Sequence, residues 1–515
     1  MQNELFKKFD YYWIFFILTV ILCYGFFLTH PVMGIDDENF IYWHRFGKHL
    51  ELNRIAHWFS AKIFNNFEFI PFHRDFLMII IFMFGITLHN YNFMKYLSPL
   101  YDKKMATMFA CITISFPFIA FYSCFSITVI ESSIVLLLSA IAIKFIFEYF
   151  EEKKNIKFWY SVTLISIIIS FYEIGILYFL MPILFIYLFK MINGKCIKNL
   201  SLKCFYSFTA CILGTFLYYV IIEICRCMMG MIYRRYSQYN MYDFSSIEIF
   251  WGTMKTNFVF FFNKFLQSCL NSTGSKIILA SSIIFTILIF YFSLKKNKYI
   301  LIYGLLLFVL NFLPFLLTGN YNIQYRVFSP FCFFISITFI LLYQLLRERK
   351  IPNLIFPIFC FFIVFYQSQE INKIFYTEYL KFQDDRLFAY SINLELNRRG
   401  INKPVLFIGT RENTKLRQDY NIEAPEINIS IFNWDRYLDV YFELFSFRPY
   451  KFMSEQGYPV RNFSEEHKFL DKDDCDAFIL KVKKLSKDME MYPKGGFIKD
   501  CGDFVLIKIG KSKLD

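Results

Sequence analysis

The chain has 515 residues, of which 56% are hydrophobic and 22% aromatic, and its mean hydropathy is +0.40. This composition excludes an ordinary soluble protein and is typical of a protein that crosses a membrane several times. The formal net charge of +13 does not indicate nucleic-acid binding, because most of the short basic clusters lie between apolar runs. In that position they are expected to fix the orientation of the spans.

The apolar runs predict about eleven membrane-spanning helices. Lys7 and Lys8 precede the first of them, and the later short loops on the same side are all basic, so the N-terminus is expected in the cytoplasm and the C-terminus outside. The run 158–189 is too long for one span and is divided at Tyr172-Glu173. One span more or fewer within 226–276 would invert everything after it. The expected spans are 12–29, 76–90, 105–122, 127–147, the two halves of 158–189, 204–224, 277–294, 299–317, 330–346 and 354–366.

The more polar segments predict two further features. Residues 39–75 mix aromatic and basic side chains, and we expect one or two helices along the outer membrane surface there. Residues 371–515 predict a small α/β domain, with a helix over 378–399 that Gly400 ends and strands over 405–409, 477–482 and 504–509. The expected fold is therefore a mostly α polytopic membrane protein. Its transmembrane domain covers 1–370, and a soluble extracytoplasmic α/β domain covers 371–515.

An acidic triplet, Asp36, Asp37 and Glu38, follows directly on the first span and is expected on the outer face. Carboxylates are unfavourable beside lipid, and three of them exceed what the end of a span needs. A carboxylate in this position can act as a general base that takes a proton from an attacking hydroxyl. We interpret Asp36 and Asp37 as candidate bases and Glu38 as a group that orients the substrate. A solvated loop is the alternative interpretation.

Other polar residues at the span ends fall on the same expected face: Glu131, Tyr172 with Glu173, and Gln324 with Arg326. A sugar transferase with a lipid-phosphate donor needs cationic groups on the departing phosphate. Arg326, helped by Arg45 or Arg54, is the candidate for that role, and an arginine that reaches to the membrane interface is the alternative. Glu131 and Glu173 have alternatives to a functional role. Glu131 can be bonded within the helix bundle, and Glu173 can be a loop residue that caps a helix. The sequence establishes no cofactor, but the acidic cluster leaves a divalent cation (Mg²⁺ or Mn²⁺) open as a phosphate-binding group.

Three of these segments carry a resemblance to a known family: Asp36-Asp37-Glu38, Phe171-Tyr172-Glu173 and Tyr325-Arg326-Val327-Phe328-Ser329-Pro330. Together with the eleven-span body and the polar tail, they make the chain similar to the bacterial glucosyltransferases of the type-II Gtr family, which modify O-antigen and related cell-surface glycans. The resemblance implies a GT-C type fold, an acidic base in the first outer loop and an undecaprenyl-phosphate sugar donor. It also implies inverting transfer on the outer face of the plasma membrane. Glu173 departs from the family, where a Gln is expected after the Tyr.

The predicted function is an integral-membrane glycosyltransferase that moves a hexose, expected to be glucose, from a polyprenyl-phosphate donor to a cell-surface glycan. Tyr172, Glu173 and Gln324 are expected to help bind the substrates. The expected partners are the lipid-linked donor, the glycan acceptor and the lipid bilayer of a bacterial plasma membrane, without nucleic acid. A flippase or transporter of lipid-linked glycans and a glycan polymerase are the alternatives. The lack of an internal sequence repeat weighs against a transporter built from inverted halves.

Overall fold

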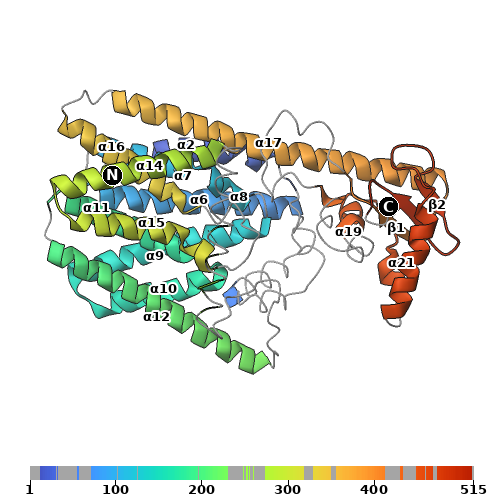
Figure 1. Cartoon of the computed structure of the whole chain (residues 1–515), viewed down its shortest axis with the longest axis horizontal. Coiled ribbons are helices and arrows are strands. Elements are labelled where there is room, and N and C mark those ends of the chain that lie inside the picture. Colours follow the sequence, from blue (N-terminus) through green and yellow to red (C-terminus); the bar gives the residue numbers. More distant parts are fainter. Residues whose placement is uncertain are drawn as a thin grey trace, which may run out of the picture. The chain divides into compact units, whose positions relative to one another are not determined.

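The computed structural model describes residues 12–30, 32, 55–56, 71–100, 103–123, 126–194, 197–229, 248, 251–252, 255, 259, 273–317, 329–349, 355–411, 430–432, 448–458, 460–467 and 472–512. This part of the chain is mostly helical and includes a small three-stranded sheet (Figure 1). The chain divides into two compact units. Unit 1 comprises Met1–Pro31 and Arg45–Phe375, and unit 2 comprises Val32–His44 and Tyr376–Asp515. The expected domain division into 1–370 and 371–515 remains a prediction.

Every expected span has a helix in its place. In chain order the helices are α2 (Tyr12–Thr29), α6 (Pro71–Leu97), α7 (Lys103–Ile114), α8 (Pro117–Ser123), α9 (Ser126–Glu152), α10 (Asn155–Phe171), α11 (Gly175–Ile192), α12 (Ile197–Met229), α14 (Thr273–Lys295), α15 (Tyr299–Leu317), α16 (Phe331–Glu348) and α17 (Ile355–Arg398). The division of the long apolar run at Tyr172-Glu173 is confirmed, because α10 ends and α11 begins on either side of this pair.

Six stretches of the described chain are long and apolar enough to cross a membrane: Tyr12–Thr29, Glu131–Glu152, Gly175–Ile192, Asn199–Cys225, Ile278–Lys295 and Phe331–Glu348. Large apolar side chains such as Phe216, Ile287 and Phe361 are exposed on unit 1, as expected for surfaces that face lipid. These helices indicate a multi-pass membrane protein. The total of eleven spans and their orientation remain predictions.

The structure differs from the sequence expectations about the elements at several places. The third span is not one helix, because α7 ends at Ile114 and α8 begins at Pro117, whose ring removes a backbone donor. The helix expected over 378–399 is confirmed, and Gly400 follows its end, but it is continuous with the last expected span in α17, which is 44 residues long. The surface helices expected over 39–75 fall largely outside the described residues, and 71–75 belong to α6.

The strand expected over 477–482 is instead part of helix α21 (Lys472–Ser486). Within α21 the buried or half-buried residues have a helical spacing rather than the alternation of a strand: they are Cys475, Phe478, Ile479, Val482, Leu485 and Ser486. Asp473 and Asp474 lie in its first turn, and Lys483 and Lys484 lie in its last. Charges placed in this way stabilise the two ends of a helix dipole.

Glycines allow close packing of the helices of unit 1, in which α9, α10 and α12 lie side by side (Figure 1). A Cβ atom on Gly85 of α6 would lie 2.9 Å from the backbone oxygen of Ser133 in α9, and one on Gly214 of α12 would lie 2.7 Å from Ile165 in α10. Membrane helices associate largely through such small residues, because lipid supplies no hydrophobic driving force between them.

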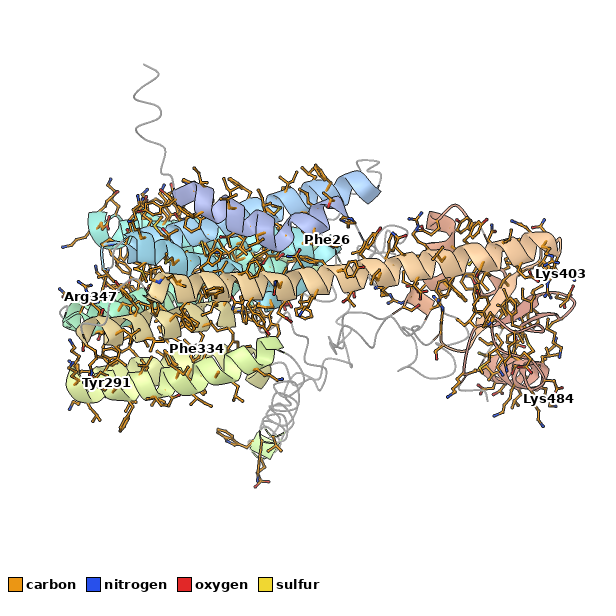
Figure 2. The ribbon with its side chains drawn as sticks, turned by 90° about the horizontal axis from the view of Figure 1, so that it is seen from above. Phe26, Tyr291, Phe334, Arg347, Lys403 and Lys484 are labelled. Atoms are coloured by element: carbon orange, nitrogen blue, oxygen red, sulfur yellow. The ribbon has the colours of Figure 1, made fainter. Side chains whose placement is uncertain are left out.

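Basic residues connect helix ends at the loops that were predicted to be cytoplasmic. Lys103 lies over the ring of Tyr12, and Lys190 and Lys203 lie over Phe147 and Phe150 at the end of α9. Lys157 pairs with Glu148 at 2.7 Å, and Lys295 and Lys296 pair with Glu348 at 2.6 and 3.0 Å. Figure 2 shows Tyr291 and Arg347 toward one end of unit 1, with Phe26 toward the opposite end. The predicted inner loops therefore contact one another.

Unit 2 contains a three-stranded sheet in the order β1-β3-β2. Strand β1 (Val405–Ile408) is parallel to β3 (Val505–Lys508), and β2 (Ile498–Asp500), which was not predicted, is antiparallel to β3. Short helices α19 (Arg448–Glu455) and α20 (Phe463–Glu466) complete the described elements. The strands at 405–409 and 504–509 are confirmed.

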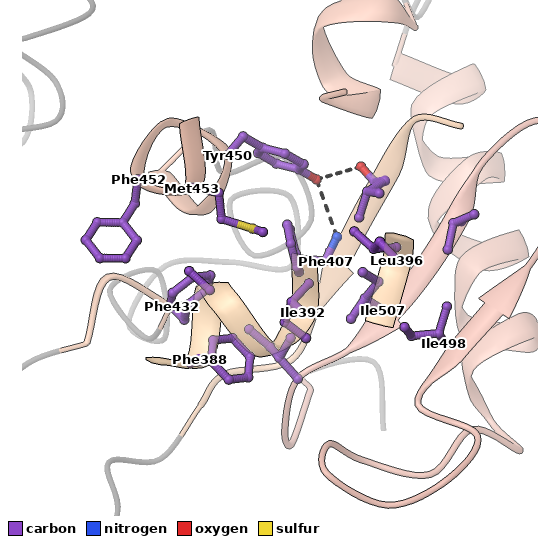
Figure 3. Packing of buried hydrophobic residues seen from close by; sticks show 14 of the residues in the cluster. Phe388, Ile392, Leu396, Phe407, Phe432, Tyr450, Phe452, Met453, Ile498 and Ile507 are labelled. Carbon is purple, nitrogen blue, oxygen red and sulfur yellow. Dashed lines mark hydrogen bonds between the residues drawn. The ribbon is translucent and has the colours of Figure 1, made fainter. Parts of the chain in front are cut away.

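Alternate residues of the strands face two apolar clusters, as the two-residue period of a strand requires. Phe407 and Ile507 pack with Phe388 and Ile392 of α17 (Figure 3), whereas Leu406 and Leu506 pack with residues of α21. The hydroxyl of Tyr450 in α19 donates to the carbonyl oxygen of Val405 at 2.8 Å and accepts from the N–H of Phe407 at 3.4 Å. This hydroxyl therefore ties α19 to β1.

Candidate functional site at the junction of α10 and α11

Of the residues expected in the site, two are described, Tyr172 and Glu173. They form the junction between α10 and α11. The others lie outside the described residues: Asp36, Asp37, Glu38, Arg45, Arg54, Gln324 and Arg326. Their expected roles remain predictions.

The junction is a sharp change of backbone conformation. Tyr172 adopts φ −158° and ψ 123°, and its N–H donates to the carbonyl oxygen of Ile168 in α10. The N–H of Gly175 then donates to the carbonyl oxygen of Tyr172 at 2.9 Å, and that of Leu177 to Ile174 at 2.9 Å. The Tyr172 side chain is buried, whereas that of Glu173 is exposed. The two neighbours that the sequence grouped as one polar pair therefore have different environments.

The junction packs on α9 close to Glu131. A Cβ atom on Gly175 would lie 2.9 Å from Cγ1 of Val135 and would collide with Ile168. Val135 is one helical turn beyond Glu131, whose side chain is only 2% exposed. The structure thus brings two of the predicted polar positions, Glu131 and Tyr172-Glu173, to neighbouring places in the bundle. A carboxyl group buried in a membrane helix bundle commonly has a functional role.

A second polar cluster surrounds the break between α7 and α8, and the sequence did not reveal it. The hydroxyl of Tyr24 donates to the carbonyl oxygen of Ile114 at 3.1 Å, and that of Ser115 donates to Oε1 of Gln367 at 2.7 Å. The hydroxyls of Thr113 and Ser336 are 2.5 Å apart. We call Tyr24, Thr113, Ser115, Ser336 and Gln367 the polar layer.

The polar layer lies at one depth in unit 1. Tyr24, Ser115 and Gln367 each lie 12 residues after the first residue of α2, α7 and α17 (24 − 12, 115 − 103 and 367 − 355), and Ser336 lies 12 residues before the end of α16 (348 − 336). At 1.5 Å per residue, this is about 18 Å from the helix ends. A broken helix inside a membrane protein needs partners for its freed backbone groups. The hydroxyl of Tyr24 is one such partner, because it bonds to the carbonyl oxygen of Ile114, the last residue of α7.

Unit 2 contains a buried charged network on one face of α17. Lys381 and Glu378 pair at 2.9 Å, and both side chains are 3% exposed. Asp385, one turn further on, is also buried and lies 3.5 Å from Arg411. Burial raises the pKa of the Asp385 carboxyl to about 6, against the opposing effects of Lys381, Ser430, Ile431 and Arg411. Sequence spacing gave one indication of this network, because residues 378, 381 and 385 share one helix face.

Among the described residues, no group of three or more His, Cys, Asp and Glu side chains is placed to hold a metal ion. The acidic triplet lies outside the described residues, so the predicted alternative of a divalent cation there stays open. Comparison with known proteins gave no relative: no family model, no curated protein and no solved structure matches the sequence.

Proposed function

We propose that this multi-pass membrane protein is a glycosyltransferase that moves a hexose, glucose in the expected case, from a polyprenyl-phosphate donor to a cell-surface glycan. In the proposed reaction an acceptor hydroxyl attacks C1 of the sugar, a carboxylate takes the hydroxyl proton, and the lipid phosphate leaves. Asp37 or Asp36 is the proposed base. Arg326, with Arg45 or Arg54, is proposed to hold the departing phosphate.

The observation that supports this function best is the proximity of Glu131 to the Tyr172-Glu173 junction. The acidic triplet and these positions were predicted on one membrane face, and the buried carboxyl of Glu131 lies one turn from the contact between α9 and Gly175. A site that accepts a sugar hydroxyl and holds a phosphate needs polar groups gathered at one end of a bundle. The contacts among the predicted inner loops are consistent with the proposed orientation, in which the N-terminus is cytoplasmic.

A transporter or flippase of lipid-linked glycans is the second candidate, and the polar layer is the observation that favours it. Transporters commonly place a broken helix and polar residues near the middle of the membrane. In this chain, however, the hydroxyls of Tyr24 and Ser115 are bonded to Ile114 and Gln367. These bonds support the break itself, so we rank the transferase first.

The test is a transfer assay with purified protein and a polyprenyl-phosphate hexose labelled in the sugar. A glycosyltransferase releases the lipid phosphate while the label enters a glycan acceptor. A transporter reconstituted in vesicles moves the labelled lipid without this release, and a polymerase extends glycan chains without using this donor.

Variants then assign the roles. Asp36→Asn with Asp37→Asn is expected to abolish transfer, and Glu131→Gln is expected to reduce it. Glu490→Gln is the matched control, because Glu490 lies in unit 2 in an exposed pair with Lys494. Full transfer by the Asp36→Asn, Asp37→Asn double variant would refute the proposed base, and label movement without phosphate release would support the transporter.

A further inference from the structure

Five cations lie together at one end of unit 1, where α14 and α16 end and α15 begins. Helix α14 ends with a lysine, two more lysines occupy the turn before α15, and α16 ends between two arginines. Helix α14 packs against both α15 and α16, so these ends belong to one region of the bundle. We call the five residues the basic corner: Lys295, Lys296, Lys298, Arg347 and Arg349 (Figure 2 labels Arg347).

A single acidic residue lies among these cations. Glu348 pairs with Lys295 at 2.6 Å and with Lys296 at 3.0 Å, and it thereby holds the end of α14 on α16. Helices α7, α14, α15 and α16 contain no other Asp or Glu. Within the part of the chain that the structure describes, the other three cations of the corner form no ion pair. Five positive charges against one negative charge give the corner a net charge of +4 (5 − 1).

An exposed apolar stripe leads along α14 to the basic corner. It consists of Ile283, Ile287, Phe290 and Leu294, whose exposed fractions are 54, 62, 56 and 75%. Steps of four, three and four residues place these side chains on one face of the helix. From the first to the last residue the stripe rises by 11 residues (294 − 283), or about 17 Å at 1.5 Å per residue. This length is close to half of a hydrocarbon core of about 30 Å, which is the depth of one leaflet.

We propose that the stripe and the basic corner together bind an anionic phospholipid, with an acyl chain along the stripe and the phosphate head group at the cations. An apolar stripe can contact the acyl chain of any phospholipid, whereas a net charge of +4 at its end favours a negatively charged head group. Arg347 and Arg349 are both exposed, and the guanidinium fork suits phosphate oxygens. Tyr299, the first residue of α15, is 44% exposed, and tyrosine is favoured at the level of the head groups.

This lipid site involves none of the residues proposed for sugar transfer, so it can be tested independently of that function. Native mass spectrometry of the full-length protein in detergent compares binding of phosphatidylglycerol and phosphatidylcholine with the same acyl chains. The wild type is expected to bind phosphatidylglycerol more tightly. Each basic residue near an anionic membrane surface strengthens binding about fivefold, so Arg347→Gln with Arg349→Gln should weaken phosphatidylglycerol binding roughly twenty-five-fold. Binding of phosphatidylcholine should stay unchanged.

The matched control is Lys153→Gln with Lys154→Gln, which removes the same charge from the turn between α9 and α10. This turn is another of the predicted inner loops, but there Lys154 already pairs with Glu152 at 2.8 Å. The control should keep the lipid preference of the wild type. An equal loss in both double variants would mean that the overall charge of the protein causes the preference, and it would overturn the site. Equal affinity of the wild type for the two lipids would overturn it as well.

Two further measurements keep the outcome decisive. If the double arginine variant lacks the thermal unfolding transition of the wild type, Glu348→Gln decides instead. This variant removes the acid of the corner and should strengthen phosphatidylglycerol binding about fivefold, whereas unchanged or weaker binding would contradict the proposal. Glycerol 3-phosphate in excess should not displace the lipid, because it has no acyl chain for the stripe. Displacement would show a site for phosphate alone and would refute the assignment to a lipid.

Discussion

Gly85→Ala is expected to destabilise unit 1, because the added methyl group has no room between α6 and α9. Its Cβ atom would lie 2.9 Å from the Ser133 backbone oxygen, with Leu137 and Leu136 at 3.5 and 3.6 Å. An ordinary van der Waals contact between these two atoms is about 0.5 Å longer, and a backbone carbonyl in a helix cannot rotate away as a side chain can. The two helices must therefore move apart, which also strains the 3.1 Å hydrogen bond from the Asn92 side chain to Ala140 in α9.

Overpacking of this kind costs about 1–3 kcal/mol. In a soluble helix, the better helix propensity of Ala would offset about 1 kcal/mol of this. In a membrane protein the separated helices are already helical, so we expect little of that offset. Thermal unfolding in detergent at one scan rate should give a midpoint several degrees lower than that of the wild type.

Gly25→Ala in α2 is the matched control, because the nearest atom to its Cβ is 3.4 Å away, in Ile21 of the same helix. It should unfold within about a degree of the wild type, since it adds the same methyl group without a clash. Equal midpoints for Gly85→Ala and Gly25→Ala would refute the packing argument. Because Ser133 lies two residues after Glu131, Gly85→Ala is also expected to lower transfer activity.

Three further predictions concern polar groups. Lys381→Met should cost about 3–5 kcal/mol, because it removes the buried cation that pairs with Glu378. Lys403→Met breaks the exposed pair with Asp500 and should change stability much less, and chemical denaturation followed in unit 2 compares the two variants. The pKa of Asp385 is raised from 3.8 to about 6, so the stability that this residue contributes should be greatest below about pH 4 and fall by about 3 kcal/mol as the pH rises to about 6. The difference in unfolding free energy between wild type and Asp385→Asn should therefore change over that window and be flat above it. A difference that does not vary with pH would contradict this prediction. In the polar layer, Thr113→Val and Ser336→Ala should each cost about 1 kcal/mol, and a double-mutant cycle should show that their effects are not additive, since the two hydroxyls bond to each other.

The sequence predicted the helices of unit 1 well, because apolar runs and basic loops are local properties. It also located the α10–α11 junction, since Tyr172-Glu173 is a polar interruption in a long apolar run. It missed the break at Ser115, although Pro117 is visible, because the run 105–122 has the length of a span and length decided the interpretation. It assigned 477–482 to a strand because six mostly apolar residues are too few to show a helical period. The helical spacing of the buried residues becomes visible only when Cys475 and Ser486, which lie on either side, are included.

Contacts between distant residues were beyond sequence reasoning. Asp385 and Ser430 are 45 positions apart, and Ser115 and Gln367 are 252 apart. No local pattern pairs them, because the tertiary fold decides which side chains meet. The proposed base and phosphate-binding residues were argued from charge and expected membrane side, and the transfer assay with the acidic variants is what will decide their roles.

The order of strands in unit 2 has a consequence for biosynthesis. Strand β3 is the centre of the sheet and the last of the three to be made, and its parallel partner β1 precedes it by 100 positions (505 − 405). Strands β1 and β2 do not pair with each other, so the sheet cannot assemble until translation has passed Lys508. Contacts between such distant residues form slowly. A nascent chain therefore leaves β1 without its strand partner for the whole of that interval, and a premature stop between Asp500 and Val505 would leave a polypeptide with two strands and no sheet.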